Sequence, residues 1–505
     1  MLSSDDISKT ISKIYGNFAI IFKDNHKLIA AVDSFSSIPL YYHLDGGVLF
    51  IFDIIEKKDV SERNILQYLL FSNVLANNTL INGVKRILPS EHLLYIFDSK
   101  LLSFIKNSKI NSNYLLGTND DNKIGHLDIV LKHAIERIIQ PLSGRTLVVS
   151  LSGGLDSRII LGFLKKMSIS KVICFSFGTP DDSDVIIGRK VAEALGYSWI
   201  PIIFTADDDT YKTFLEEGSV NKYREYAFNG GNMVYLQDYY AYWYLKHYSL
   251  IPDDSVFIFG YGGDLLAGSS IPDKTNSLNS ETDMVKIIID KWFINWRDSG
   301  ELQCVKNMIR DTLELYNKSI DELFPGYSNE YKYIYQIESF AFHNVLCKNI
   351  LNRLRAVEFL GFQWRCPFLD SEVVDFFQSL SYLERVNENL YKQYAVTHLF
   401  TAELECLRCI RCTTFLPVKS FNNSWGVVNN ICDYERFSQI SKFIYLLEDE
   451  IDAPSVDCVQ KYVNNIQNIQ IKNTIQRIIS NRIENKGKLS TLEYKSIRLL
   501  SLLNQ

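Results

Sequence analysis

The sequence lacks the features that would place it in a membrane or outside the cell. It has no uninterrupted run of about 18 apolar residues, the length that a membrane-spanning helix requires. Its nine cysteines begin only at Cys174, which is unlike a disulfide framework. A secretory signal is basic and then apolar, whereas this chain opens with Met1-Leu2-Ser3-Ser4-Asp5-Asp6. We therefore expect a cytoplasmic protein with reduced thiols and no membrane partner.

A basic surface is missing as well. The 59 acidic residues outnumber the 53 basic ones, which gives a net charge of -6 at pH 7. Nucleic-acid-binding proteins carry a basic stripe that neutralises phosphates, so no nucleic-acid partner is expected. Apolar residues at 47% and charged residues at 22% are ordinary globular values. A chain of 505 residues is too long for one core, so about two or three domains are expected.

The N-terminal part is predicted to be rich in β-strands. Short apolar or alternating runs are separated by turn residues such as Asp24-Asn25 and Gly46-Gly47, a pattern typical of antiparallel hairpins. The expected strands cover residues 17–23, 27–32, 39–43, 47–52 and 92–97, with a helix over residues 61–72. The polar stretch 107–123 is the predicted linker.

After the linker the pattern changes to alternating strands and helices. Apolar residues from Leu127 to Ile138 follow the spacing of an amphipathic helix. Wholly apolar runs over residues 147–151, 172–177, 200–204 and 256–259 are typical of buried parallel strands. This alternation predicts a doubly wound α/β domain with a parallel sheet, followed from about residue 330 by mainly helical structure. The aromatic stretch 235–244 is interpreted as helix packing, with a stacking platform as the alternative.

A glycine-rich run at the end of the first of these strands is the strongest motif. Glycines let the backbone turn tightly, and N–H groups at a helix N-terminus attract anions; a helix is expected to begin at about Ser157. Asp156 would repel bare phosphate, which suggests a metal ion between them. No Gly-Lys-Ser/Thr run is present, so this is not a Walker loop, and the alternative is a plain Gly-Gly turn. The predicted nucleotide-binding residues here are Ser150, Leu151, Ser152, Gly153, Gly154, Leu155, Asp156 and Ser157.

The run from Ser152 to Ser157 resembles the pyrophosphatase loop (PP-loop) of the asparagine synthetase family, which includes β-lactam synthetase and lasso-peptide cyclases. Further segments are similar to motifs of the same family, from about residue 15 to about residue 420. They are Gly16-Asn17-Phe18-Ala19, Pro39-Leu40-Tyr41-Tyr42, Gly83-Val84-Lys85-Arg86-Ile87-Leu88-Pro89, Phe175-Ser176-Phe177-Gly178, Phe259-Gly260-Tyr261-Gly262-Gly263-Asp264 and Arg365 followed by Pro367-Phe368-Leu369-Asp370.

The resemblance implies a fold and an activity. It implies an α/β adenine-nucleotide α-hydrolase-like synthetase domain over residues 120–420, preceded at 1–110 by a β-rich remnant of an N-terminal-nucleophile amidohydrolase domain. Residues 421–505 would be a helical extension. Enzymes of this family use ATP to form an acyl-adenylate, release pyrophosphate and pass the acyl group to an amine or ammonia. Asp156 and Asp264 would hold Mg²⁺, and the alternative for Asp264 is a helix N-cap. Phe177, Phe259 and Gly260 would contact the nucleotide.

The N-terminal part departs from the family pattern. Glutamine-using members carry a nucleophilic cysteine directly after the initiator methionine, where this chain has Leu2. The first half of the amidohydrolase domain is therefore expected to be missing. The nitrogen would come from free ammonia, from an amine, or from a separate amidase subunit.

The expected catalytic residues depart from the pattern too. Tyr261 stands where asparagine synthetases have Glu and β-lactam synthetase has Tyr, so it is a candidate base that needs an acidic partner, with Glu358 and Glu338 as candidates. The alternative is that Tyr261 only forms a wall of the pocket. The family's catalytic Lys corresponds to Cys412, so Arg411 is the predicted cation. Arg408 and Lys392 are alternatives to Arg411, and a metal bound by Cys406, Cys409 and Cys412 is a separate alternative for this segment.

Four functions remain open at this point. The first is an adenylating amide ligase, and the second is a tailoring amidotransferase or cyclase that acts on a sugar acid or a peptide. The third is a non-catalytic ATP-binding partner protein, which the loss of acids at Leu265, Asn349 and Gln363 favours. The fourth is a tRNA-modifying PP-loop enzyme, which the acidic charge opposes.

Overall fold

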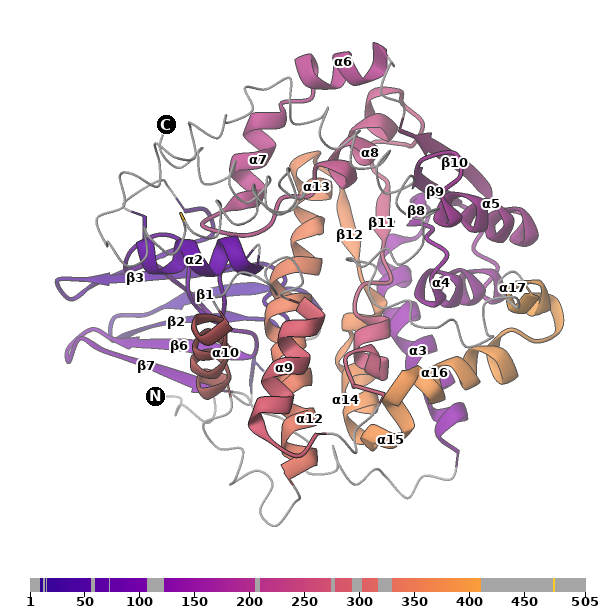
Figure 1. Cartoon of the computed structure of the whole chain (residues 1–505). Coiled ribbons are helices and arrows are strands. Elements are labelled where there is room, and N and C mark those ends of the chain that lie inside the picture. The colour runs from indigo at the N-terminus through magenta and orange to yellow at the C-terminus, as the bar shows by residue number, and fades with distance from the viewer. Residues whose placement is uncertain are drawn as a thin grey trace.

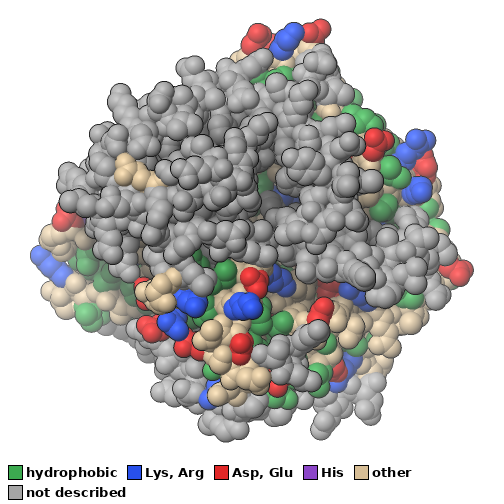
Figure 2. Space-filling view, viewed as in Figure 1, with side chains coloured by type: hydrophobic (Ala, Val, Ile, Leu, Met, Phe, Trp, Pro, Cys, Tyr) green, Lys and Arg blue, Asp and Glu red, His purple; other side chains and the backbone are tan. Residues whose placement is uncertain are grey.

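The computed structural model describes residues 10–11, 14, 16–55, 60–71, 73–106, 122–204, 209–273, 278–292, 302–316, 329–409 and 476. Within them lie two antiparallel sheets from the N-terminal part and one parallel sheet, with α9 and α12 between them in the view of Figure 1. None of the described helices has the length and apolar character needed to cross a membrane. Where described side chains reach the face in Figure 2, basic and acidic groups are interspersed.

The N-terminal part contains two antiparallel sheets. Their strands include all five that were predicted, with the predicted turns between them, whereas the strands at residues 85–86 and 101–106 were not predicted. The four-stranded sheet has the order β1-β2-β6-β7 and the three-stranded sheet the order β4-β3-β5. Residues of both sheets, among them Ala30, Tyr42 and Tyr95, pack into one shared core. The elements are β1 (Ala19–Lys23), β2 (Lys27–Val32), β3 (Tyr41–Asp45), β4 (Val48–Phe52), α2 (Glu62–Phe71), β5 (Lys85–Arg86), β6 (Glu91–Ile96) and β7 (Leu101–Lys106).

The parallel sheet confirms the predicted α/β architecture. Its order is β10-β9-β8-β11-β12, and every neighbouring pair is parallel. The strand of this sheet that comes first in the sequence, β8, therefore lies between β9 and β11, so the strand order reverses there. In such sheets ligands bind beyond the carboxyl ends of the strands at this reversal. The strands are β8 (Leu147–Ser150), β9 (Val172–Gly178), β10 (Ser198–Ile203), β11 (Val256–Ile258) and β12 (Gln363–Arg365).

Helices cover both faces of this sheet, as the side chains of β9 show. The Phe175 ring packs edge-on against Tyr242 of α8. The next residue, Ser176, points to the other face, where Gly188 of α5 comes so close that an added Cβ would lie 2.2 Å from the Ser176 hydroxyl. The aromatic stretch on α8 is buried, with Tyr239 and Tyr242 at 1% and 0% exposed, which confirms the helix-packing interpretation.

From about residue 330 the described chain is mainly helical, as expected, except that β12 lies within this region. The remaining helices fall on both sides of residue 330. They are α3 (Lys123–Ile139), α4 (Leu155–Lys166), α5 (Ser183–Leu195), α6 (Asp209–Glu217), α7 (Val220–Phe228), α8 (Leu236–His247), α9 (Glu281–Trp292), α10 (Leu302–Tyr316), α12 (Asn329–Phe340), α13 (Leu354–Phe359), α14 (Ser371–Ser379), α15 (Tyr382–Arg385), α16 (Asn389–Tyr394) and α17 (Glu405–Cys409).

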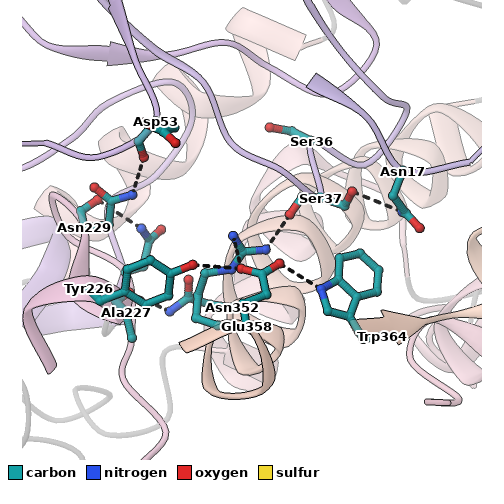
Figure 3. A network of polar contacts seen from close by, with 12 residues as sticks. Asn17, Ser36, Ser37, Asp53, Tyr226, Ala227, Asn229, Asn352, Glu358 and Trp364 are labelled. Carbon is teal, nitrogen blue, oxygen red and sulfur yellow. Dashed lines mark hydrogen bonds and ion pairs between the residues drawn. The ribbon is translucent and has the colours of Figure 1, made fainter. Parts of the chain in front are cut away.

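The N-terminal sheets are joined to the α/β part through the turn between α7 and α8 (Figure 3). The Asn229 side chain accepts a hydrogen bond from the Ile55 N–H at 2.8 Å and donates one to the Asp53 carbonyl at 2.7 Å. The Leu80 N–H donates to the Gly230 carbonyl at 2.7 Å. Backbone groups of the N-terminal part therefore form hydrogen bonds with residues of the α/β part across a shared interface.

The predicted domain boundaries stay a prediction. Most of the linker stretch 107–123 and all of the extension 421–505 lie outside the described residues. The interpretation of the N-terminal sheets as a remnant of an amidohydrolase domain also stays a prediction.

Candidate functional site

The glycine-rich run lies at the carboxyl end of β8, where the strand order reverses. Helix α4 begins at Leu155, two residues before the predicted start, with Gly154 as its N-cap. Leu155, Asp156 and Ser157 therefore form the first turn of α4. The N–H groups of a first turn have no partner within the helix, so they are the donors that this segment can offer to an anion.

The glycine N–H groups themselves are already engaged within the protein. The Gly153 N–H donates to the Asp184 carboxylate of α5 at 2.8 Å, and the Gly154 N–H donates to the Ser152 hydroxyl at 3.2 Å. Gly188 lets α5 pack tightly enough to reach the run, because a Cβ there would lie 3.2 Å from the Leu151 carbonyl oxygen. Helix α5 thus braces the loop, a contact that no pattern in the sequence indicated.

The second glycine motif follows β11 and packs directly onto Asp156. A Cβ added to Gly260 would lie 2.6 Å from the Asp156 Cβ, and one added to Gly263 would lie 2.7 Å from the Asp156 Cγ. Such distances exclude any larger side chain at either position. The two glycine motifs, far apart in sequence, therefore meet around one carboxylate.

Three acidic side chains act on one another at this meeting point. The Asp156 carboxylate accepts hydrogen bonds from the Asp264 N–H at 3.2 Å and from the Tyr391 hydroxyl at 2.7 Å. Burial raises the pKa of Asp156 well above its ordinary value of 3.8, and the charges of Asp264 and Glu388 raise it further. The Asp264 side chain is reachable by solvent, yet the protein atoms around it raise the pKa of its carboxyl as well.

This arrangement fits a divalent cation. Two neighbouring carboxylates with raised pKa values are stabilised in their ionised form by a positive charge between them, and carboxylate oxygens are ligands that Mg²⁺ accepts. Among the described residues, no group of three or more His, Cys, Asp and Glu side chains is close enough to hold a metal. A cation held by Asp156 and Asp264 would therefore take its other ligands from water and phosphate, as Mg²⁺ commonly does.

Aromatic side chains flank the loop on the neighbouring strands. Phe177 lies near the end of β9, 5.8 Å from Phe204 between ring centroids. Phe259 directly follows β11 and stacks on Tyr261 at 4.9 Å with an interplanar angle of 2°. Because β8 lies between β9 and β11, the predicted nucleotide residues Phe177, Phe259 and Gly260 are all at the same edge of the sheet as the loop.

Tyr261 belongs to a polar network that the sequence did not indicate. Burial raises the pKa of its phenol, and the charge of Asp238 raises it further, whereas Arg353 and a hydrogen bond with Tyr242 lower it. Arg353 lies 3.7 Å from Asp238, and the Tyr242 hydroxyl donates to Asp238 at 3.4 Å. Among the acidic side chains, Asp238 on α8 therefore has the largest effect on the pKa of Tyr261.

Glu358, the predicted partner of Tyr261, is engaged elsewhere (Figure 3). Its carboxylate accepts from the Tyr226 hydroxyl at 3.0 Å and from the Trp364 indole at 2.8 Å, and it pairs with Arg355 at 2.7 Å. The predicted catalytic role of Glu358 finds no support in these contacts.

The other candidate partner, Glu338, is engaged as well. It is buried in a two-point pair with Arg385 at 2.6 and 2.9 Å, and the described contacts of this pair do not include Tyr261.

Of the residues predicted to supply a cation to the site, the structure describes the side chain of Lys392 alone. Arg411 and Cys412 lie outside the described residues, as does the side chain of Arg408. Lys392 lies on α16 and pairs with Glu388 at 2.9 Å. Lys291 of α9, which sequence reasoning missed, lowers the pKa values of both Asp264 and Glu388. No local pattern around Lys291 could have pointed to it.

Fold and site together define an α/β protein in which the N-terminus of a helix lies beside a pair of carboxylates. The family model described as asparagine synthase matches residues 126–399, more than half of the chain, and this stretch includes Asp156, Asp264 and Tyr391. The chain belongs to the asparagine synthase family, which confirms the family expected from its motifs. Membership supports a ligase-type enzyme that uses ATP. A search of curated proteins found no match.

Proposed function

We propose that this protein is an ATP-dependent amide ligase that activates a carboxylate as its adenylate, releases pyrophosphate and transfers the acyl group to ammonia or an amine. The observation that carries the proposal is the meeting of both glycine motifs around Asp156 at the carboxyl edge of the sheet. That edge is where nucleotides bind in doubly wound folds. Adenylation separates pyrophosphate from ATP, so the enzyme needs an anion site beside a cation site, and this edge offers both.

Each part of the site has a distinct task in this proposal. The N–H groups of the first turn of α4, which have no partner within the helix, bind phosphate oxygens, and so does the Ser157 hydroxyl, which otherwise donates to the Ser152 carbonyl at 3.4 Å. Asp156 and Asp264 hold Mg²⁺, which supplies the positive charge that a pyrophosphate leaving group requires. Asp184 keeps the loop in shape through the Gly153 N–H. Phe177, Phe259 and Gly260 line the nucleotide.

Tyr261 is the residue that bears on the choice of acceptor. Its raised pKa keeps the phenol protonated at neutral pH, so it cannot act alone as a base. Its contact with Tyr242, which in turn contacts Asp238, offers a route through which the phenol could exchange a proton during transfer. Because glutamate stands at this position in asparagine synthetases, the tyrosine favours an organic amine, such as one on a sugar or a peptide, over ammonia.

A second candidate is a non-catalytic ATP-binding partner protein. It is favoured by the engagement of Glu358 and Glu338 in pairs with arginines, which leaves Tyr261 without a direct carboxylate partner among the described contacts. Such a protein would bind the nucleotide through the same loop and release no pyrophosphate.

The test is a pyrophosphate-release assay with ATP, Mg²⁺ and a matrix of carboxylates and amines, ammonia and glutamine included. The ligase predicts turnover with at least one pair and none when either ATP or Mg²⁺ is omitted. Nucleotide binding without turnover, both alone and with a candidate amidase subunit added, would instead support the partner protein. Measurable glutamate from glutamine alone would contradict the expectation that the nitrogen comes from elsewhere.

A further inference from the structure

Helix α16 carries two buried tyrosines that make matching contacts with two different aspartates. The Tyr391 hydroxyl donates to Asp156 at 2.7 Å, and the Tyr394 hydroxyl donates to Asp128 of α3 at 2.8 Å. Their exposed fractions are 1% and 0%. Only the first of these pairs lies at the glycine motifs. The chain therefore contains, on one short helix, a Tyr–Asp pair in the candidate site and a similar one outside it.

The position of the Tyr391 hydroxyl is fixed by the packing of its ring. Phe368 and Phe377 meet the ring edge-on, with centroid distances of 6.1 and 5.9 Å. Phe368 follows β12, and Phe377 lies on α14. Because the ring is held from both of these elements, the hydroxyl is presented to Asp156 from a rigid support rather than from a mobile side chain.

The Asp156 carboxylate is held from two directions as a result. One oxygen accepts from Tyr391, and the other accepts from the Asp264 N–H. Asp264 and Glu388 bring negative charge towards the same group, whereas the Tyr391 hydrogen bond favours the ionised carboxylate. Burial keeps the Tyr391 pKa well above its ordinary value, so the hydroxyl stays a donor at neutral pH.

We propose that Tyr391 is a positioning residue for the nucleotide site: its hydroxyl holds the Asp156 carboxylate in the orientation in which Asp156 and Asp264 together receive Mg²⁺-bound ATP. The inference rests on the proposed function of this edge of the sheet. The inference extends that function to Tyr391 on α16, which lies far from the loop in the sequence. Metal-dependent binding of ATP would depend on this residue.

The experiment compares Tyr391→Phe with Tyr394→Phe, each of which removes one hydroxyl from a buried Tyr–Asp pair. ATP binding is measured by titration calorimetry in Mg²⁺ and again in EDTA, and folding is checked by thermal unfolding. We expect both variants to lose a similar amount of thermal stability. Tyr391→Phe should weaken binding in Mg²⁺ by about tenfold or more, the scale of a hydrogen bond to a charged group, and leave binding in EDTA within about twofold. Tyr394→Phe should bind like the wild type in both media.

A double variant separates positioning from packing and covers the case in which Tyr391→Phe alone folds poorly. In the Asp156→Asn background, adding Tyr391→Phe should not weaken Mg²⁺-dependent binding further, because the carboxylate that it positions is gone. A further loss there would overturn the inference, as would equal losses in Mg²⁺ and in EDTA for the single variant. Failure of the wild type to bind ATP in either medium would instead overturn the proposed function, which the wild-type titration reveals on its own.

Discussion

Glu358 and Asp156 are two partly buried acids that each accept a hydrogen bond from a tyrosine, and the rest of their surroundings differs. Glu358 also has the Arg355 guanidinium at 2.7 Å and the Trp364 indole at 2.8 Å. Asp156 has the negative charges of Asp264 and Glu388 nearby, and its pKa is raised. The first acid is neutralised within the protein, whereas in the proposed function the second is balanced by a bound cation. On the proposed function, this difference is the one expected between a structural acid and an acid of a binding site.

The largest effect is expected from removing Asp156, which pairs with no cation in the described contacts. Asp156→Ala should lower ATP-dependent pyrophosphate release by about 100-fold or more, because metal-borne charge stabilisation amounts to several kcal/mol. The variant should remain folded, because the substitution removes the repulsion between Asp156 and the charges of Asp264 and Glu388 and breaks no salt bridge of the described residues. Release rate and circular dichroism are the measurements. Release that stays at the wild-type rate when Mg²⁺ is limiting would speak against Asp156 as a ligand.

Tyr261→Phe is expected to act on one half-reaction alone. If the phenol takes part in the transfer step, amide formation should fall by about 10²-fold, a typical contribution of a positioned proton-transfer group. Carboxylate-dependent exchange of labelled pyrophosphate into ATP should be unchanged, because activation does not involve the amine. A small and equal change in both steps would mean that Tyr261 only forms a wall of the pocket.

Glu358→Ala should show the opposite behaviour from Asp156→Ala. We expect a loss of about 2 kcal/mol in the free energy of unfolding, because Arg355, Tyr226 and Trp364 lose their shared acceptor. Affinity for Mg²⁺-bound ATP should stay within about twofold. Denaturant unfolding and calorimetry measure the two quantities. Glu358→Gln, which keeps one acceptor oxygen, is the matched control and should lose less. If Glu358→Ala instead lost nucleotide binding and kept its stability, Glu358 would be an acid of the binding site and not a structural one.

The smallest effect concerns pH. A carboxyl whose pKa is raised in the folded state contributes stability that is complete below its unfolded pKa and is lost as pH rises through the folded pKa. For Asp156 the window therefore begins near its ordinary value of 3.8 and extends upward. Without Mg²⁺, Asp156→Asn should be more stable than the wild type at neutral pH, and the difference should shrink as pH falls towards 4. An unfolding series across this range that shows a constant difference would contradict the assignment.

Much of the fold was predictable because its signals are local. The apolar runs of β8, β9 and β10 and the turns of the N-terminal hairpins stand out in the sequence. β12 was not predicted, since its three residues are too few to show a period. The start of α4 was misplaced by two residues because Gly154, an uncommon N-cap beside Ser and Asp, takes that role.

The loops of the site were predictable from the sequence, whereas the helix residues that contact these loops were not. Asp156 and Asp264 follow from glycine runs at strand ends, and the structure brings them together. Tyr391 and Lys291 come from helices whose place depends on the whole fold, so no spacing in the sequence marks them. Glu358 shows the reverse case, because the contacts described for it are with Tyr226, Trp364 and Arg355 rather than with Tyr261.

The central claim is that Asp156 and Asp264 form a cation-dependent nucleotide site, and titration of ATP into the wild-type protein tests it most directly. The account predicts that ATP binds at least about tenfold more tightly in Mg²⁺ than in EDTA, and that Asp156→Asn removes most of this difference. Equal affinity of the wild type in both media, or a difference that Asp156→Asn leaves intact, would contradict it.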